Sequence, residues 1–243
     1  MLHLRRITRI MSIKRHIPNL ITLLNLLCGC IAVVFVSQSN FEMAFFFVCG
    51  GIFLDFFDGF FARLFKVSSP LGLQLDSLAD MVTSGVTPGF VMFQLMSNGN
   101  LVHPWFPYLG FLVTLGSCYR LANFNIDTRQ TDSFIGLPTP ANTLFIMSLP
   151  LVLQHTDSLV LLELLVNPWV LLIVSVFSAL MLNAEIPLFS LKIKKIGFKG
   201  NELPILFLLY SLVLLVVLTY AALPVIILSY IVLSVINNKF LHR

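Results

Sequence analysis

Long apolar stretches follow one another from end to end of this sequence, and they constrain its fold more than any other feature. A helix needs about 18–20 apolar residues to cross a bilayer. About eight stretches approach that length, separated by short polar, proline or glycine breaks. They lie at residues 18–37, 42–64, 71–96, 105–124, 138–154, 160–182, 203–221 and 223–238. The sequence therefore predicts an all-α, polytopic bundle of transmembrane helices.

The composition excludes the main alternatives. Of the 243 residues, 58% are hydrophobic and 11% are charged, whereas soluble domains are about half apolar and a quarter charged. A soluble globular fold is therefore excluded, and so is a nucleic-acid-binding chain, despite the net charge of +4. The joint near Ala222–Pro224 leaves open whether the last two stretches form one long kinked helix.

The basic residues indicate the orientation, because cytoplasmic loops near a membrane are enriched in Lys and Arg. With eight spans and both termini cytoplasmic, all 15 fall on one side: Arg5, Arg6, Arg9, Lys14, Arg15, Arg63, Lys66, Arg120, Arg129, Lys192, Lys194, Lys195, Lys199, Lys239 and Arg243. We expect a multi-pass protein of the bacterial cytoplasmic (inner) membrane. Residues 1–16 are expected to be a basic surface segment, either an amphipathic helix or a flexible tail, ahead of an uncleaved signal anchor.

Four aspartates interrupt the second and third apolar stretches, where an unpaired carboxylate is costly. Asp55 and Asp58 are three residues apart and Asp76 and Asp80 four apart, so each pair shares a helix face. The short turn near Ser68–Pro70 predicts antiparallel neighbouring helices. All four carboxylates then lie in one layer, about 12 to 20 Å from the turn at ~1.5 Å per residue.

Four carboxylates in one layer repel one another, and two divalent cations would compensate them. Oxygen ligands favour Mg²⁺, Mn²⁺ or Ca²⁺ over zinc. Paired metals of this kind support phosphoryl transfer. Small residues, Gly59 and Gly72, share the carboxylate faces and leave space between the helices. A divalent-cation transporter is the alternative from another class, but it predicts acidic residues staggered through the bilayer.

The stretch from Asp55 to Asp80 reads D-x2-D-G-x2-A-R-x8-G-x3-D-x3-D. It resembles the signature of the CDP-alcohol phosphatidyltransferase family at every fixed position. The resemblance implies a membrane enzyme, a homodimer, that moves a phosphatidyl group from a CDP-linked lipid to an alcohol and releases CMP. It also implies two divalent cations, Mg²⁺ or Mn²⁺.

The resemblance assigns roles by position. Asp55, Asp58 and Asp76 would hold one metal, while Asp55, Asp76 and Asp80 would hold the other, with Asp80 also the general base. The CDP moiety would contact Gly59, Arg63, Ser69, Asn19 and Thr22.

Three further segments bear on the acceptor alcohol. Arg120-Leu-Ala-Asn123-Phe-Asn125 and Gly136–Asn142 resemble segments of the family members that use serine, as does Ile186–Lys192. Asn123 stands where those members usually have a second Arg, and a single Arg suits serine better than a glycerol phosphate carrying about two charges. We expect Arg120, Asn123, Asn125 and Lys192 to bind the acceptor. The substrates would be CDP-diacylglycerol and L-serine, with glycerol phosphate, inositol or another alcohol as alternatives.

The expected organisation has four parts. A basic segment, 1–16, precedes a catalytic core, 17–182. A basic cytoplasmic loop, 183–202, connects the core to C-terminal transmembrane helices and a basic tail, 203–243.

Overall fold

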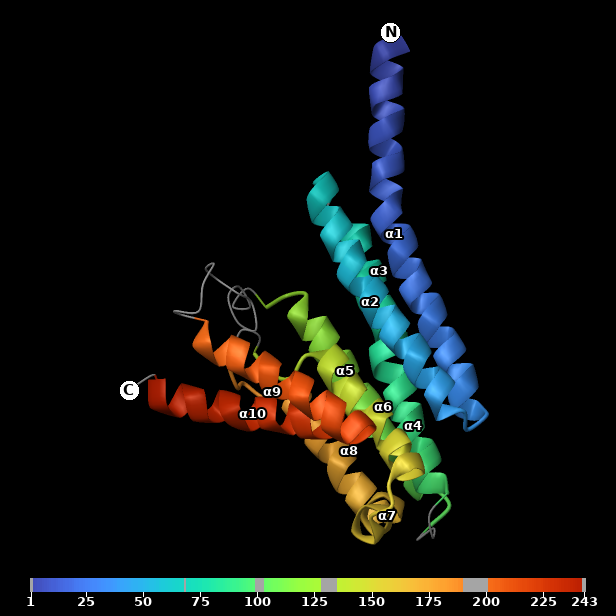
Figure 1. Cartoon of the computed structure of the whole chain (residues 1–243). Helices are drawn as coiled ribbons and strands as arrows, with labels where there is room; N and C mark the ends of the chain where they lie inside the picture. The colour runs from blue at the N-terminus through green and yellow to red at the C-terminus, as the bar shows by residue number, and fades with distance from the viewer. Residues whose placement is uncertain (1, 68, 99–102, 128–134, 190–200, 242–243) are drawn as a thin grey trace.

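The computed structural model describes residues 2–67, 69–98, 103–127, 135–189 and 201–241. Its α-helices are α1 (Leu2–Ser37), α2 (Phe41–Phe65), α3 (Pro70–Asp80), α4 (Thr87–Ser97), α5 (Leu112–Phe124), α6 (Thr139–His155), α7 (Leu159–Val166), α8 (Pro168–Asn183), α9 (Glu202–Leu218) and α10 (Ala222–Leu241). A π-helix, η1 (Met81–Val86), joins α3 to α4, and two 3-10 turns, η2 (Phe106–Phe111) and η3 (Thr219–Ala221), precede α5 and α10. The predicted all-α class is confirmed (Figure 1).

Several helices suit a bilayer. Within the described residues, His16–Ser37, Phe41–Phe65 and the stretch Glu202–Asn238, which contains α9 and most of α10, are long and apolar enough to cross a membrane. Helices α7 and α8 would make a fourth if counted as one span. Their surfaces are apolar as well: Phe207 is the one buried residue of α9, and Val216 is 76% exposed. Because exposing such large apolar surfaces to water is energetically unfavourable, the chain is an integral membrane protein.

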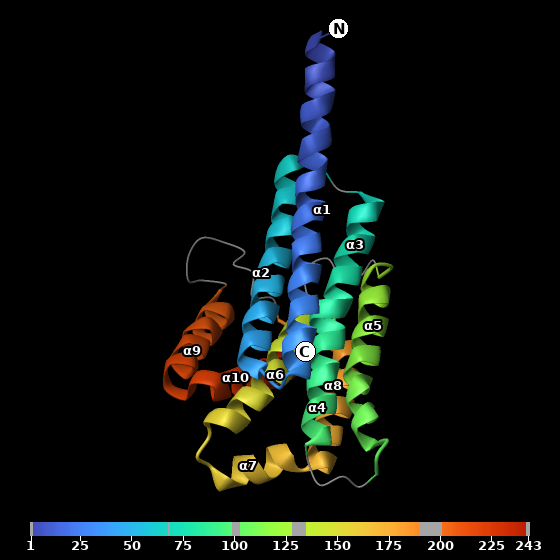
Figure 2. The same cartoon turned by 90° about the vertical axis from the view of Figure 1, so that its right-hand side faces the viewer.

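The predicted sixth span, 160–182, is not one straight helix. It divides into α7 and α8, which are bent by 73° at Asn167. Pro168 starts α8, and the Asn167 side chain accepts a hydrogen bond from the Trp169 amide. A residue before proline is disfavoured in the α conformation, so the helix ends there. Figure 2 shows α7 lying across the end of the upright bundle.

The turn between α2 and α3 is defined by helix caps. Lys66 ends α2 in the left-handed conformation, with φ of 55°. Ser69 then caps α3 by accepting a hydrogen bond from the Gly72 amide at 3.0 Å, and Pro70 occupies the first turn. With so few residues between them, α2 and α3 run in opposite directions, as the sequence predicts (Figure 2). Helix α1 packs along both of them.

The predicted third span, 71–96, corresponds to α3, η1 and α4 (Pro70–Ser97), with a π-helical turn directly after Asp80. A π-turn widens the helix and leaves carbonyls without their usual partners. Here the Ser84 carbonyl accepts from the Thr143 hydroxyl at 3.0 Å, and the Gly85 carbonyl accepts from the Thr114 hydroxyl at 2.9 Å. Hydroxyls from α5 and α6 therefore stabilise the irregular turn.

Helices α1 and α2 approach this π-turn closely through glycines. A Cβ on Gly29 would lie 2.4 Å from Thr83 Oγ1, and one on Gly51 would lie 2.8 Å from both Asn25 Oδ1 and Thr83 Cγ2. The absence of these two side chains lets three segments meet around Asn25 and Thr83.

Gly51→Ala is expected to lower the free energy of unfolding by about 1–3 kcal/mol, because the added methyl overpacks a buried crossing. Gly50→Ala is the matched control, since a Cβ at Gly50 would have nothing within 4 Å. Thermal unfolding of the purified proteins in one detergent measures both. Equal melting temperatures for the two variants would contradict the close approach.

The last two predicted helices are separate rather than one kinked helix. Thr219, with φ of 48°, interrupts them, and α10 runs back beside α9 (Figure 1). Their facing residues form a small core with the start of α6 and the segment before residue 190. This core contains Leu137, Leu188, Phe189, Phe207, Ala222, Ile226, Tyr230 and Ile231.

Candidate active site

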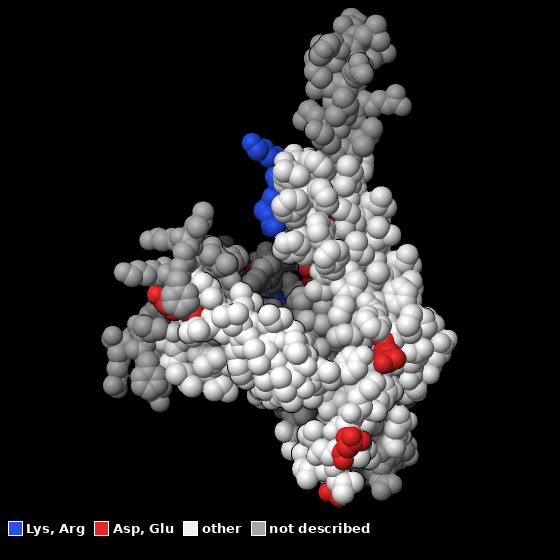
Figure 3. All heavy atoms as spheres, in the orientation of Figure 1, with Lys and Arg blue, Asp and Glu red and all other residues white. Residues whose placement is uncertain are grey.

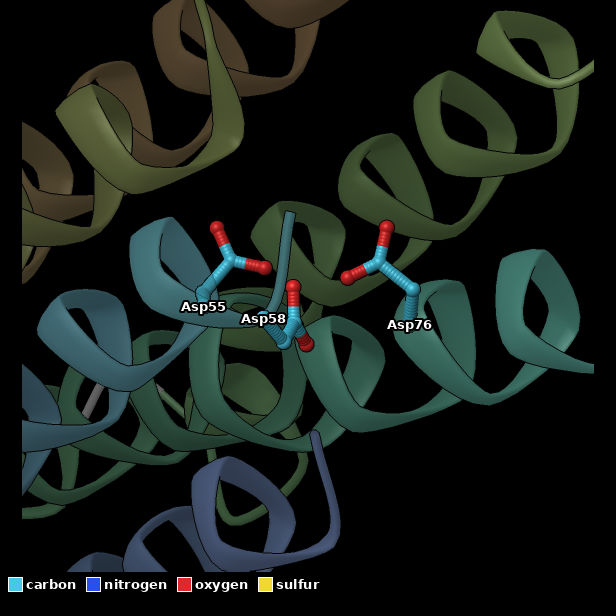
Figure 4. Close-up of side chains that lie close together, drawn as sticks. All are labelled: Asp55, Asp58 and Asp76. Atoms are coloured by element: carbon cyan, nitrogen blue, oxygen red, sulfur yellow. The ribbon is translucent and has the colours of Figure 1, made fainter. Parts of the chain in front are cut away.

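Three carboxylates meet between α2 and α3. The side chains of Asp55, Asp58 and Asp76 point toward one another (Figure 4), and each supplies an oxygen within 4.8 Å of the other two. Asp58 is buried, and the other two are partly buried. The antiparallel turn between α2 and α3 brings these residues together from 18 to 21 positions apart in sequence. The group could hold a metal ion.

The surroundings of Asp76 fit a cation. Its Oδ1 is buried and has no hydrogen-bond partner within the described residues, while carboxylate oxygens of Asp55 and Asp58 lie within 4.8 Å of a carboxylate oxygen of Asp76. Two carboxylates at this separation repel unless a proton or a cation lies between them. Because the three side chains offer only hard oxygen ligands, the residues fit Mg²⁺ or Mn²⁺.

Asp80 lies outside this group of three but close to it. It follows Asp76 by one turn of α3 and lines a cavity together with Asp55 and Asp76. Its Oδ1 accepts a hydrogen bond from the Asn25 Nδ2 at 3.1 Å. Of the four predicted metal ligands, three therefore lie in one cluster. The fourth, Asp80, lies beside the cluster and is hydrogen-bonded to the side-chain amide of Asn25.

Two cavities flank Asp76, which lines both of them. The first has a volume of about 220 Å³ and is lined by Asp55, Asp76, Ser77, Asp80, Arg120, Leu121, Phe124, Asn125, Pro138, Thr139 and Pro140. The second has a volume of about 180 Å³ and is lined by Pro18, Asn19, Thr22, Asp58, Gly59, Ala62, Val67, Ser69, Gly72, Leu73 and Asp76. Acidic atoms are visible inside a hollow of the surface in Figure 3. The arrangement can accommodate one molecule on each side of a shared carboxylate cluster.

The second cavity collects the residues that the resemblance assigns to CDP. Asn19, Thr22, Gly59 and Ser69 line it. The Thr22 hydroxyl donates to Asp58 and thereby holds a carboxylate of the cluster. Arg63 is not among the lining residues, but its guanidinium lies 3.6 Å from the position that a Cβ on Gly59 would take.

The first cavity holds some of the predicted acceptor residues. Arg120 and Asn125 line it, and the Asn125 Nδ2 donates to Ser77 Oγ at 2.8 Å. Arg120 is buried, and its Nη1 donates to the carbonyls of Ile135 and Leu182, both at 2.9 Å. Asn123 is exposed and is not among the residues that line this cavity. Lys192 lies outside the described residues.

Sequence reasoning missed the network that holds Asp80. Asn25 is fully buried, and while its Nδ2 donates to Asp80, its Oδ1 accepts from the Thr83 hydroxyl at 2.9 Å. A polar residue within an apolar span was a signal. Its partners, however, lie 55 and 58 residues away in sequence.

These features define an integral membrane protein with a carboxylate cluster that is able to bind metal between two cavities. The CDP-alcohol phosphatidyltransferase family model matches residues 15–181. Since this match covers more than half of the sequence, the chain belongs to that family.

Individual relatives carry names that are more specific than the family description. The chain is 37% identical over 129 residues to a CDP-diacylglycerol–serine O-phosphatidyltransferase of Bacillus subtilis, covering 51% of this chain and 70% of the relative. Enzymes of the same name from Helicobacter pylori and Saccharomyces cerevisiae are 34% and 32% identical, over 54% and 55% of this chain. In those two comparisons the chain spans about half of the relative, 55% and 53%.

Proposed function

We propose that this protein transfers the phosphatidyl group of CDP-diacylglycerol to L-serine, producing phosphatidylserine and CMP. The observation that carries the proposal is the pair of cavities on either side of Asp76, one lined by the candidate CDP residues and the other by Asp80 and Arg120. The names of the relatives support serine as the acceptor.

In this proposal Asp55, Asp58 and Asp76 hold one divalent cation, and Asp80 contributes to a second with Asp55 and Asp76. Bound divalent cations neutralise phosphate charge and orient the attacking and leaving groups. Gly59, Arg63, Ser69, Asn19 and Thr22 bind the CDP part of the donor. Because Gly59 has no side chain, it leaves room for a diphosphate, and Arg63 adds a positive charge beside that space.

Asp80 acts as general base. It accepts the proton of the serine hydroxyl, and the serine oxygen attacks the phosphorus that carries diacylglycerol. The bond from that phosphorus to the CMP oxygen breaks, and CMP leaves with the bonding electrons. Asn25 keeps one oxygen of Asp80 occupied and so limits the rotation of the carboxylate.

Another acceptor with the same chemistry is the competing hypothesis. Arg120 is the one described Lys or Arg that lines the first cavity, and its Nη1 is already used by two backbone carbonyls. One partly engaged guanidinium matches the single carboxylate of serine better than the roughly doubly charged phosphate of glycerol phosphate.

Serine-dependent CMP release tests the function directly. Purified protein with Mg²⁺ or Mn²⁺ and CDP-diacylglycerol is expected to release CMP when serine is added. Glycerol phosphate and inositol are expected to support less than about a tenth of that rate, since losing the matched polar contacts costs at least about 1.4 kcal/mol. Faster release with either of these alcohols would overturn serine as the acceptor.

We also propose that the protein is a homodimer in the bacterial cytoplasmic membrane, with its site open to the cytoplasm. The orientation is supported by the direction of the helices, since α2 and α5 end toward the same side as the start of α1 (Figure 1). That side carries the basic residues Arg63 and Lys66. The homodimer rests on the family resemblance.

A further inference from the structure

The C-terminal helix α10 does more than face lipid. It belongs to the part of the chain beyond the family match, which ends at residue 181. Tyr230, Ser234 and Asn238 follow one another at four-residue intervals on one face of α10. The Tyr230 hydroxyl donates to the Phe189 carbonyl at 2.8 Å, and the Phe189 amide donates to Ser234 Oγ at 3.3 Å. Asn238 donates to the Pro187 carbonyl. One helix face therefore binds the backbone of the segment 185–189 at three points.

That segment in turn holds the chain just before α6. The Gly136 amide donates to the Ile186 carbonyl at 2.9 Å, and Ile135 forms an isolated antiparallel bridge with Pro187. Gly136 has a φ of +75°, and a Cβ there would lie 2.7 Å from the Leu182 carbonyl and 3.0 Å from Arg120 Nη1. The contact between 135–136 and 182–187 is consequently tight and requires glycine.

These two segments contact one wall of the first cavity, which Arg120, Pro138, Thr139 and Pro140 line. Arg120 reaches across to the carbonyls of Ile135 and Leu182, and Pro138, Thr139 and Pro140 follow directly on Gly136. The hydrogen bonds of Tyr230 and Ser234 to Phe189 are buried, whereas the bond from Asn238 to Pro187 is exposed. The position of Arg120 therefore depends on a chain of contacts that starts at Tyr230 and Ser234.

We infer that Tyr230 and Ser234 of α10 are positioning residues for the acceptor side of the site, acting through segment 185–189 on Arg120 and Pro138–Pro140. This inference rests on the proposed function in one respect, namely that the first cavity receives the acceptor alcohol. The second cavity shares no lining residue with this wall, because the one residue common to both cavities is Asp76. A change at Tyr230 should accordingly affect the acceptor and spare the CDP-lipid.

Tyr230→Phe is the sharpest test, because it removes the hydroxyl and keeps the ring, which packs on Phe189 with centroids 4.8 Å apart. We expect the KM for serine to rise about fivefold, as the loss of one hydrogen bond implies. The KM for CDP-diacylglycerol should stay at the wild-type value, and the melting temperature should fall by no more than about 5 °C, as the loss of one buried hydrogen bond implies. Ser234→Ala should act in the same direction, and Ser234→Thr, which keeps a hydroxyl, should restore the wild-type KM.

Tyr210→Phe is the matched control. Tyr210 lies on α9 and also packs on a ring of the same core, Phe207, but among the described residues its hydroxyl has no hydrogen bond. It should leave both KM values unchanged. An unchanged serine KM in Tyr230→Phe and Ser234→Ala would overturn the inference, and so would an equal rise in both KM values.

Hydrogen exchange separates this inference from the proposed function, because it needs no turnover. In Tyr230→Phe combined with Ser234→Ala, the amides of Gly136 and Leu137 should exchange several-fold faster than in the wild type, while amides of α2 and α3 keep their rates. Unchanged exchange at Gly136 and Leu137 would overturn the inference even if serine proves to be the acceptor. If serine fails but another alcohol supports CMP release, the same KM comparison applies to that alcohol.

Discussion

Asp76→Asn is expected to reduce turnover by at least about 10³-fold and to weaken the binding of Mg²⁺ or Mn²⁺ by a similar factor. Asp76 belongs to the three-carboxylate cluster, lines both cavities and has a buried oxygen without a hydrogen-bond partner in the described chain. The amide cannot supply the negative charge that compensates a cation. Metal titration followed by thermal shift, together with CMP release, measures both effects.

Gln74→Ala is the control for Asp76→Asn. Gln74 lies exposed on the same helix and is absent from the lining of both cavities. It should retain wild-type metal binding and turnover. If the Asp76→Asn protein binds metal with the wild-type midpoint, the carboxylate cluster is not the metal site. The proposed metal-assisted chemistry would then be wrong.

Asp80→Asn is expected to lower kcat by about 10²–10⁴-fold, which is the usual contribution of a general base. Asparagine has nearly the same shape and can still accept the Asn25 hydrogen bond, so the fold and the binding of CDP-diacylglycerol should be retained. Binding of the lipid and the melting temperature are measured beside single-turnover CMP release. Turnover near the wild-type rate in Asp80→Asn would exclude Asp80 as the base.

Much of the site could be predicted from the sequence because its chemistry is concentrated in one short stretch. Asp55, Asp58 and Asp76 converge as their spacing and the short turn predict. The candidate CDP residues Asn19, Thr22, Gly59 and Ser69 also line one cavity, although Asn19 and Thr22 come from another helix. Helical periodicity and a tight turn leave few other arrangements for α2 and α3.

The proposed acceptor side of the site was harder to predict. The sequence predicts that Arg120 binds the alcohol, and in the structure its Nη1 donates to two backbone carbonyls. Asn123 was expected beside it but is exposed on α5. Both residues lie near a helix end, where the direction of a side chain depends on the segments that pack against it. Leu182, whose carbonyl accepts a hydrogen bond from Arg120, lies 62 residues further along the sequence.

Other differences between prediction and structure have causes that mean hydropathy does not reveal. The bend between α7 and α8 follows from Asn167–Pro168, a signal of dihedral restriction inside a run that is apolar on average. The π-turn after Asp80 depends on hydroxyls of Thr114 and Thr143, which reach it from two other helices. Neither hydrophobic length nor periodicity contains that information.

The linear order of residues was enough to establish a helical membrane protein with carboxylates at one depth, because apolar length, charge and helical spacing are properties of single segments. Only the tertiary structure decided which carboxyl oxygens share one site, how Asn25 reaches Asp80, and that α10 supports the wall beside Arg120. Those contacts join residues tens of positions apart. They form where packing of the whole bundle brings them together, which no single segment specifies.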